Sequence, residues 1–491
     1  MQHTGSGSRW AWSIGERPTY RHVVSHITTE RPSIVTLAEL SAAGYQPRTV
    51  KAEIRTNLVA ALRGGATAFP GVVGFDDTVL PELERALLAG HDVVLLGERG
   101  QGKTRLMRTL TGLLDEWSPV VEGCEIHDDP ATPVCVRCRT LIAQLGGELP
   151  VGWRHRDDRY GEKLATPDTS VGDLIGDIDP TKVAQGRPLG DPETVHYGLL
   201  PRTNRGIFAI NELPDLAERI QVALFNVLEE RDIQVRGYAL RLPLDLLLVA
   251  SANPEDYTNR GRIITPLKDR FGAEIRTHYP LDIDDEVTLV TQEATVVAAV
   301  PVHLVEVVAR FAAGLRESSA IDQRSGVSAR FAIAATEAAS ASALRRAALT
   351  GESEPVARIV DLPDVVPTLR GKVEFEMGEE GREYDVLTHL LRVATAATFR
   401  DRLRGVDLAA FTAHFAEGET LETGVLTPAG DVLEQMGSVP GLATVLDRLG
   451  VEEDTVSPGQ AAAAVEFVLE GLHLSRRLAK DTVDGVTVYG S

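Results

Sequence analysis

The sequence predicts an α/β fold with a mostly parallel sheet, followed by a helical lid and a further helical C-terminal region. A glycine-rich run at 97–104 joins an apolar segment to an amphipathic one. Up to residue 281, apolar runs that suit buried strands alternate with segments of helical periodicity. Such alternation favours a parallel sheet that is covered on both faces. From Asp282 onward the pattern is almost entirely helical.

Composition restricts the classes of function. The chain has 491 residues, a length that suggests about three domains. Its formal net charge of −21 disfavours binding to nucleic acid or to an anionic membrane, because phosphate groups require a basic surface. Apolar runs stay short of the ~18 residues that span a membrane, and the N-terminus has no apolar signal core. With only three cysteines, the protein is expected to be cytoplasmic rather than a disulfide-stabilised secreted scaffold.

Periodicity and composition divide the chain into five segments. We expect disorder in 1–35, helix in 36–70, the α/β domain in 71–281, the helical lid in 282–350 and a helical region in 351–491. The expected strands are 92–96, 206–210, 244–251 and 274–278, with a β-hairpin at 233–242. The expected helices include 216–231, 302–315, 329–347 and one that starts at Ser457, Pro458 and Gln460.

The run at 97–104 matches G-x-x-x-x-G-K-[ST], the phosphate-binding loop of nucleotide hydrolases. It consists of Gly97, Glu98, Arg99, Gly100, Gln101, Gly102, Lys103 and Thr104. A strand is expected before it and a helix after it, as this motif requires. Glycines allow the backbone to wrap around a polyphosphate. Lys103 is then expected to reach the β- and γ-phosphates of ATP, and Thr104 to bind Mg²⁺.

Two other strand ends carry polar side chains. The expected strand 206–210 runs into Asn211 and Glu212. Glu212 is the candidate general base for an attacking water, while Asn211 stands where an acidic residue usually supports Mg²⁺ and offers only an uncharged carbonyl oxygen. Asn253 follows another apolar strand and is a candidate for bonding the γ-phosphate and orienting the water. A simple strand-end turn is the alternative interpretation at both places.

Together these residues resemble the AAA+ ATPases, and within them the magnesium chelatase I subunit and its MoxR relatives. The resemblance rests on the 97–104 loop, the stretch from Gly198 to Glu212, Ser-Ala-Asn-Pro-Glu at 251–255 and Leu-Lys-Asp-Arg-Phe-Gly at 267–272. It covers residues 71–347 and leaves both ends of the chain unexplained. The 71–281 segment is therefore expected to be an AAA+ P-loop domain.

The resemblance implies a ring of subunits, often six, with ATP held between neighbours. It gives Arg270 the role of a finger that reaches the neighbour's γ-phosphate, with an ordinary surface salt bridge as the alternative. It gives Arg330 the role of a second sensor of the same nucleotide, for which Arg324 is a competitor. Segment 168–196 corresponds to an insertion that projects from the ring. The family also suggests a separate partner protein with a von Willebrand A domain. This sequence has no D-x-S-x-S motif, so such a domain is expected on another chain.

The three cysteines form a second candidate site. All lie within 124–138, as Cys124-x-x-His127 followed by Cys135-x-x-Cys138. Three thiolates and one imidazole match a closed, tetrahedral Zn²⁺ site of the structural type. A group of free cysteines in an exposed loop is the alternative. The position of the cluster, away from the expected γ-phosphate, disfavours a catalytic metal.

Two classes of function remain open. The first is an AAA+ ATPase that hydrolyses ATP at the subunit interfaces of a ring, in order to remodel a partner protein or drive metal insertion. The second is a nucleotide-gated scaffold with little turnover, which only Asn211 supports. A helicase-like motor is disfavoured by the acidic balance of the chain.

Overall fold

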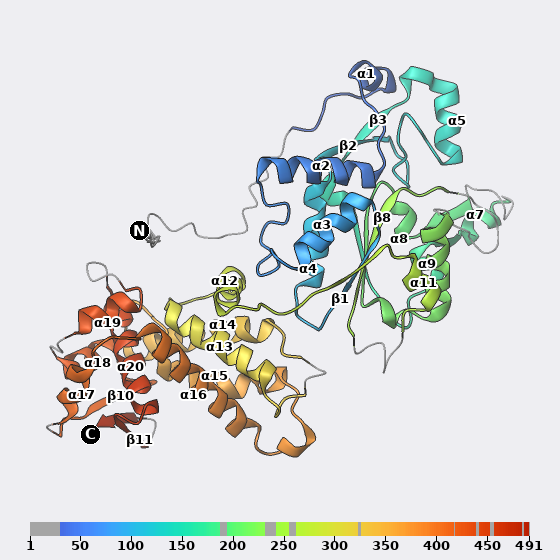
Figure 1. Cartoon of the computed structure of the whole chain (residues 1–491). Coiled ribbons are helices and arrows are strands. Elements are labelled where there is room, and N and C mark those ends of the chain that lie inside the picture. Colours follow the sequence, from blue (N-terminus) through green and yellow to red (C-terminus); the bar gives the residue numbers. More distant parts are fainter. Residues whose placement is uncertain are drawn as a thin grey trace, which may run out of the picture.

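The computed structural model describes residues 30–186, 194–230, 242–254, 262–322, 326–416, 418–437, 441–451, 456–483 and 486–490. Figure 1 shows two lobes, an N-terminal lobe drawn in blue to green and a C-terminal lobe drawn in yellow to red. Helix α12 (Ile283–Glu293) lies where the two lobes meet. The candidate residues 97–104, 211–212 and 253 all belong to the N-terminal lobe.

A five-stranded parallel sheet forms the centre of the N-terminal lobe, in the order β4-β7-β8-β1-β9. The strands are β1 (Val93–Leu96), β4 (Tyr160–Leu164), β7 (Gly206–Asn211), β8 (Leu246–Ala252) and β9 (Ala273–Arg276). Leu96 pairs with Ala252, and Ile210 pairs with Ala250. This register brings the carboxyl ends of β1, β7 and β8 to one edge of the sheet, so the residues that follow these strands meet there.

The alternation of side chains along β1 explains why both faces of the sheet are covered. Val93 and Leu95 pack in one hydrophobic core with α2, α3 and α4, whereas Val94 and Leu96 pack in another with α9 and α11. These helices are α2 (Val50–Gly64), α3 (Val79–Ala89), α4 (Lys103–Thr109), α9 (Glu218–Glu230) and α11 (Thr265–Arg270). The expected α/β fold with a parallel sheet is confirmed.

Shorter elements extend this lobe beyond the central sheet. They are α1 (Leu37–Ala42), β2 (Trp117–Val121), α5 (Val136–Leu145), β3 (Val151–His155), α6 (Val171–Leu174), β5 (Gly176–Ile178), α7 (Pro180–Ala184), β6 (Val195–Tyr197) and α8 (Leu199–Arg202). β2 and β3 form an antiparallel ribbon, and β5 pairs with β6 inside the segment expected as an insertion.

The C-terminal lobe is mostly helical and is built on one continuous hydrophobic core that runs from Val290 to Tyr489. Its other helices are α13 (Val302–Glu317), α14 (Arg330–Thr350), α15 (Leu362–Leu369), α16 (Glu383–Arg402), α17 (Ala409–Ala416), α18 (Ala429–Met436), α19 (Leu442–Arg448) and α20 (Pro458–Leu474). A three-stranded antiparallel sheet of β10 (Leu421–Gly424), β12 (Val486–Gly490) and β11 (Ala479–Val483) adds to these helices. The residues of the expected lid thus share their core with the residues that follow them.

Several expectations can be compared with individual elements. Ser457 caps α20 through a reciprocal capping box with Gln460, as its sequence predicts. The 36–70 segment contains two helices, α1 and α2. The hairpin expected at 233–242 lies almost wholly outside the described residues, as do Arg324, Glu255 and most of the N-terminal 1–35 segment. Within the described part of the chain, no helix has both the length and the apolar character needed to cross a membrane.

Candidate nucleotide-binding site

The loop between β1 and α4 has the backbone that a phosphate-binding loop requires. Gly100 and Gly102 both have φ of 76°, a left-handed conformation that glycine adopts without a steric penalty. A Cβ added at Gly100 would lie 1.9 Å from Ser328 Oγ, whereas one added at Gly102 would meet no atom within 4 Å among the described residues. The loop is therefore packed against the C-terminal lobe at Gly100 and open at Gly102, where α4 begins.

Lys103 connects this loop to the next strand end. Its side chain is buried, and Nζ donates to the carbonyl oxygens of Gly97 at 2.5 Å and Glu98 at 2.7 Å. Nζ also donates to Asn253 Oδ1 at 2.7 Å, and Asn253 Nδ2 donates to Glu212 Oε2 at 2.8 Å. The lysine, the amide and the carboxylate thus form one continuous chain of hydrogen bonds across the ends of β1, β8 and β7.

The position of Glu212 depends on an unusual backbone conformation. Glu212 follows β7 with φ 55° and ψ 49°, in the left-handed region, and its N–H donates to Ser251 Oγ at 3.2 Å. For a residue other than glycine this conformation costs on the order of 1 kcal/mol or more. Such strain is common where a side chain must be directed into a functional site, and here it accompanies the contact between Glu212 and Asn253.

Thr104 and Asn211 form a second contact at the same edge. Thr104 Oγ1 donates to Asn211 Oδ1 at 2.9 Å, which places two uncharged oxygen atoms side by side. Oxygen atoms of this kind can bind Mg²⁺ directly or accept a hydrogen bond from a water molecule that is bound to Mg²⁺. The amide of Asn211 is oriented from its other end, because Nδ2 donates to Glu162 Oε1 at 2.7 Å.

Glu162 is a residue of this site that the sequence did not reveal. It lies on the edge strand β4, whose partner β7 pairs Leu164 with Asn211. Arg108 Nε and Nη2 bind the Glu162 carboxylate at 2.8 and 3.0 Å, so Asn211, Glu162 and Arg108 form a connected group. The sequence signal was weak, because β4 is a short strand of partly exposed residues, and only its pairing with β7 brings Glu162 beside Asn211.

Residues from the junction of the lobes close the other side of the loop. Tyr279 OH donates to the carbonyl oxygen of Arg99 at 2.8 Å. The guanidinium of Arg316, on α13, lies over the Tyr279 ring at 4.3 Å and binds the Glu286 carboxylate at 2.7 and 2.9 Å. Arg316 Nε also donates to the carbonyl oxygen of Val327. The loop is therefore linked to α12, α13 and the segment before α14.

The two arginines expected to contact nucleotide are positioned differently. Arg330 is the first residue of α14, and its N–H donates to Oγ of Ser328, the residue that touches Gly100. Arg270 ends α11, where Nη1 lies 2.9 Å from Glu229 Oε2 and the guanidinium lies 5.1 Å from the centre of the Phe225 ring. Within one chain Arg270 therefore has the ion pair of the alternative interpretation, and its side chain remains 38% exposed.

The structure brings the three cysteines together, with Asp128 rather than His127 beside them. Cys124, Cys135 and Cys138 lie with Asp128 in one buried group, whose ligand atoms are all within 4.8 Å of one another. His127 is not part of it. The chain turns at His127, which has φ 55°, and this turn carries the following residue, Asp128, into the group instead.

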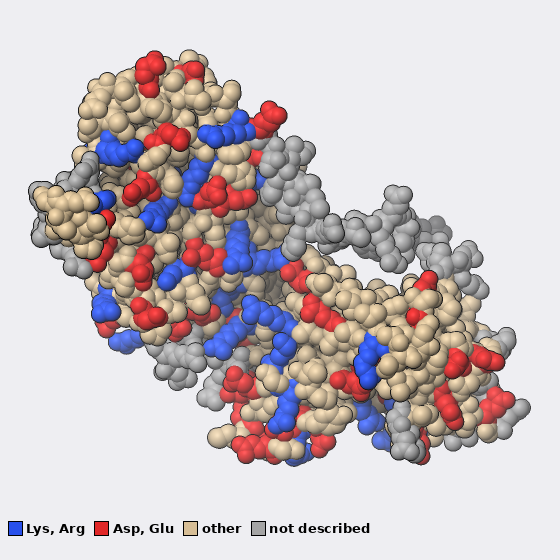
Figure 2. Space-filling model, turned by 180° about the vertical axis from the view of Figure 1, so that it is seen from behind, with Lys and Arg blue, Asp and Glu red and all other residues tan. Residues whose placement is uncertain are grey.

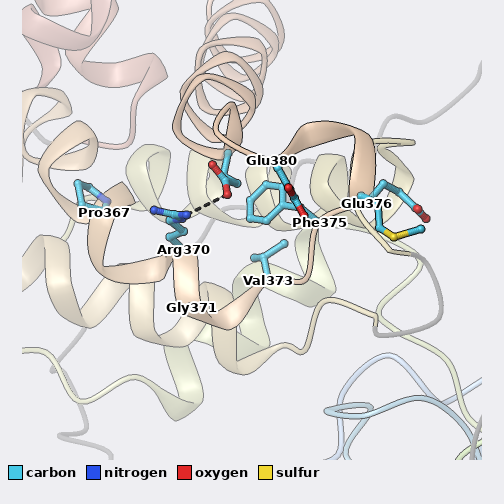
Figure 3. Close-up of a pocket in the computed structure, with 9 residues that line it drawn as sticks. Pro367, Arg370, Gly371, Val373, Phe375, Glu376 and Glu380 are labelled. Carbon is cyan, nitrogen blue, oxygen red and sulfur yellow. Dashed lines mark hydrogen bonds and ion pairs between the residues drawn. The ribbon is translucent and has the colours of Figure 1, made fainter.

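Other hollows and charges lie elsewhere on the molecule. A pocket of about 470 Å³ lies between α15 and α16 (Figure 3), and its lining contains no residue of the 97–104 loop. Beside it, Arg370 Nη2 lies 2.9 Å from Glu383 Oε1. On the face shown in Figure 2, acidic and basic side chains are interspersed over both lobes, and basic ones gather near the junction between them. The Figure 3 pocket is therefore separate from the candidate nucleotide site.

Comparison with known proteins identifies relatives of this chain. The magnesium-chelatase 38 kDa subunit of Rhodobacter capsulatus is 30% identical over 240 residues, which cover 46% of this chain and 60% of that subunit. The corresponding subunit of Cereibacter sphaeroides is 30% identical over 208 residues, covering 41% and 55%. The chloroplastic magnesium-chelatase subunit ChlI-2 of Arabidopsis thaliana is 28% identical over 238 residues, covering 46% and 52%.

The chain thus spans a little over half the length of these relatives. No protein-family model matches it. Among solved structures, a model of the BchI–BchD complex of magnesium chelatase aligns with a TM-score of 0.35 at 22% identity, covering 64% of this chain and 98% of that one. The RuvB branch-migration motor of Thermotoga maritima aligns with a TM-score of 0.31 at 14% identity, covering 86% and 95%. Scores this low carry no argument, so the likeness rests on the sequence relatives. The chain is similar to magnesium-chelatase I subunits, and its loop, strand ends and parallel sheet are consistent with an AAA+ ATPase of that type.

Proposed function

We propose that the chain is an ATPase that hydrolyses ATP at the subunit interfaces of a ring and uses the energy to remodel a partner protein or to drive metal insertion. The observation that carries this proposal is the hydrogen-bonded chain from Lys103 through Asn253 to Glu212. It places a phosphate-binding cation and a candidate general base at one edge of the sheet.

Each residue then has a role that its chemistry allows. Lys103 exchanges its contacts with the loop carbonyls for the β- and γ-phosphates of ATP. Asn253 orients the attacking water, and Glu212 takes a proton from that water as general base. Thr104 and Asn211 hold Mg²⁺ or its water ligands. When bound, Mg²⁺ neutralises charge on the phosphate oxygens.

The pairing of Asn211 with Glu162 accounts for the amide at a position that is usually acidic. An aspartate at 211 would bring a second carboxylate within 2.7 Å of Glu162 Oε1, where two negative charges repel strongly. An amide at 211 and a carboxylate at 162 keep one negative charge near the metal position. We infer that Glu162 supplies at least part of the charge that Asn211 lacks.

The ring is the part of this proposal that reaches beyond one chain. Family resemblance supports a homo-oligomer, with six subunits expected, in which Arg270 leaves Glu229 and reaches the neighbour's γ-phosphate. Arg330 stands close enough to the loop, through Ser328 and Gly100, to sense the nucleotide of its own subunit. A partner with a von Willebrand A domain and a cytoplasmic location complete the proposal.

The second candidate, a nucleotide-gated scaffold with little turnover, retains one observation in its favour. Asn211 brings no charge of its own, and Glu162 is already engaged by Arg108. A scaffold would bind ATP through the 97–104 loop and assemble without hydrolysing it.

Steady-state hydrolysis of ATP separates the two candidates. We expect measurable turnover in the wild type and a loss of roughly 10²–10⁴-fold in Glu212→Ala, as for removal of a general base. Lys103→Ala should lose both binding and turnover. Lys372→Ala and Glu376→Ala, two exposed positions in the C-terminal lobe, are the matched controls. Equally negligible rates in the wild type and both site variants, with ATP still bound by the wild type, would favour the scaffold.

A further inference from the structure

The cysteine cluster joins the segment that follows β2 to the start of α5, in the N-terminal lobe. Cys124 follows β2, while Cys135 is the N-cap of α5 and Cys138 lies in its first turn. The three cysteines are at most 7% exposed, and Asp128 is 1% exposed. One ligand atom from each of the four residues lies within 4.8 Å of the other three. In a tetrahedral zinc site with Zn–S bonds of ~2.3 Å, neighbouring sulfurs are roughly 3.8 Å apart, so only small shifts separate this group from a metal-binding one.

The backbone around the sulfur atoms favours thiolates. The N–H of Asp128 donates to Cys124 Sγ at 3.5 Å, and the N–H of Cys138 donates to Cys135 Sγ at 3.3 Å. Each half of the cluster therefore supplies one amide to one sulfur. The second amide also belongs to the first turn of the ten-residue helix α5, where the helix dipole stabilises negative charge.

The buried carboxylate of Asp128 gives separate evidence for a bound metal ion. Its Oδ2 accepts hydrogen bonds from the N–H groups of Val134 at 3.1 Å and Cys135 at 2.8 Å. Its Oδ1 is buried without a hydrogen-bond partner. A buried carboxylate oxygen is rarely left unsatisfied, and a metal ion at the centre of the group would satisfy it.

We propose that Cys124, Cys135, Cys138 and Asp128 bind one structural Zn²⁺ ion. Three thiolates and one carboxylate oxygen complete a tetrahedral shell without an open position for substrate. This ligand set replaces His127 with Asp128. The proposal is independent of ATP hydrolysis, because none of the four residues belongs to the Lys103–Asn253–Glu212 chain.

The contacts of the knuckle (residues 124–138) show what the ion stabilises. Asn204 Nδ2 donates to the carbonyl oxygen of Ile126 at 3.1 Å, and Arg205 Nη2 pairs with Asp129 Oδ2 at 3.0 Å. Asn204 and Arg205 come directly before β7, the strand that ends at Asn211 and leads to Glu212. The zinc ion would therefore fix the start of β7, while the candidate chemistry takes place at its other end.

Metal analysis of the full chain, purified without chelator, tests the proposal. We expect one zinc per chain in the wild type and in His127→Asn, the matched control. Asp128→Asn should lose its zinc at roughly tenfold or lower chelator concentration than the wild type, and Cys138→Ser should contain little zinc. Zinc far below one per chain in the wild type would overturn the site. An equal loss in His127→Asn and Asp128→Asn would overturn the ligand assignment.

A measurement on the wild type avoids variants that fail to fold. The chelator-treated full chain is titrated with Co²⁺ alone, whose absorption reports tetrahedral coordination and bonds to thiolate. We expect both absorption features to saturate at one Co²⁺ per chain. The fluorescence of Trp117 and Trp153, on the adjacent β2–β3 ribbon, should change with the same end point. A disulfide within the cluster, or the absence of Co²⁺–thiolate absorption in the reduced protein, would overturn the proposal.

Discussion

Two networks of polar side chains, one in each lobe, differ in how far solvent reaches them. The strand-end network of the N-terminal lobe joins the buried side chains of Lys103 and Asn253 to the partly exposed Glu212. Beside it lies Glu162, whose side chain is 23% exposed and pairs with the more exposed Arg108. The buried network of the C-terminal lobe joins two arginines and two carboxylates that are all at most 1% exposed: Arg346, Arg358, Asp361 and Glu466.

This difference separates groups that can react from groups that can only hold the fold. The strand-end network lies beside the open backbone at Gly102, where α4 begins, so we expect its contacts to be exchangeable for contacts with a ligand. Arg358 Nη1 lies 3.0 Å from Glu466 Oε1 with both side chains fully buried, and no ligand can replace that partner. Substitutions in the first network should therefore change turnover, whereas those in the second should change stability.

The largest effect is expected for Arg270→Ala. If Arg270 serves as the finger in a ring, its loss should lower ATP turnover by roughly 10³-fold or more. The stability of the monomer should hardly change, because the pair with Glu229 is exposed and exposed pairs contribute little. ATP turnover and thermal unfolding should be measured beside Arg276→Ala, a control whose side chain is 81% exposed. Unchanged turnover would leave Arg270 with only its salt bridge.

Arg358→Met should produce the opposite pattern. Removal of the guanidinium leaves Glu466 buried without its ion-pair partner, which typically costs about 3–5 kcal/mol of unfolding free energy. Urea unfolding followed by far-UV circular dichroism measures this loss, and turnover per folded chain should be unchanged. The double variant Arg358→Met with Glu466→Leu should regain most of the stability, because no unpaired charge remains. Equal destabilisation in the single and double variants would contradict a charge-pairing origin.

His303 tests the comparison through the pH dependence of the unfolding free energy. It lies on α13 in the core of the C-terminal lobe, where burial lowers its pKa to about 3. The unfolded chain binds this proton first, at an ordinary pKa near 6.5, so stability that is present above pH 6.5 declines as the pH falls toward 3. Between pH 6.5 and 5, His303→Leu should lose about 2 kcal/mol less unfolding free energy than the wild type. Parallel pH curves from urea titrations would show that His303 is not the source.

The smallest effect is expected at Asn211. Asn211→Asp alone places two carboxylates against each other. It should therefore not lower the Mg²⁺ concentration that is needed for half-maximal turnover. Asn211→Asp combined with Glu162→Gln moves the negative charge to position 211 and preserves the hydrogen bond between the two side chains. We expect the double variant to need roughly tenfold less Mg²⁺ for half-maximal turnover than the single variant, about the worth of one pKa unit of interaction. Identical Mg²⁺ titrations would show that Glu162 and Asn211 act independently.

The sequence predicted those parts of the site that lie in one short stretch of chain or directly follow a predicted strand. The 97–104 loop lies between an apolar strand and a helix, and Asn211, Glu212 and Asn253 follow strands whose parallel order brings their ends together. Glu162 could not be predicted in this way, because its role depends on pairing between β4 and β7. The replacement of His127 by Asp128 depends on one left-handed residue that a spacing pattern does not contain. The C-terminal strands are only four or five residues long and lie in a region of mostly helical periodicity, so the sequence predicted that region as helical.

The central claim is that Glu212 activates water toward a nucleotide held by the loop containing Lys103. Single-turnover conversion of bound, radiolabelled ATP to ADP tests it most directly, in the wild type and in Glu212→Gln at saturating protein. We predict that both bind ATP with similar affinity, and that Glu212→Gln converts it at least roughly 100-fold more slowly. Conversion at the wild-type rate in Glu212→Gln would contradict the claim.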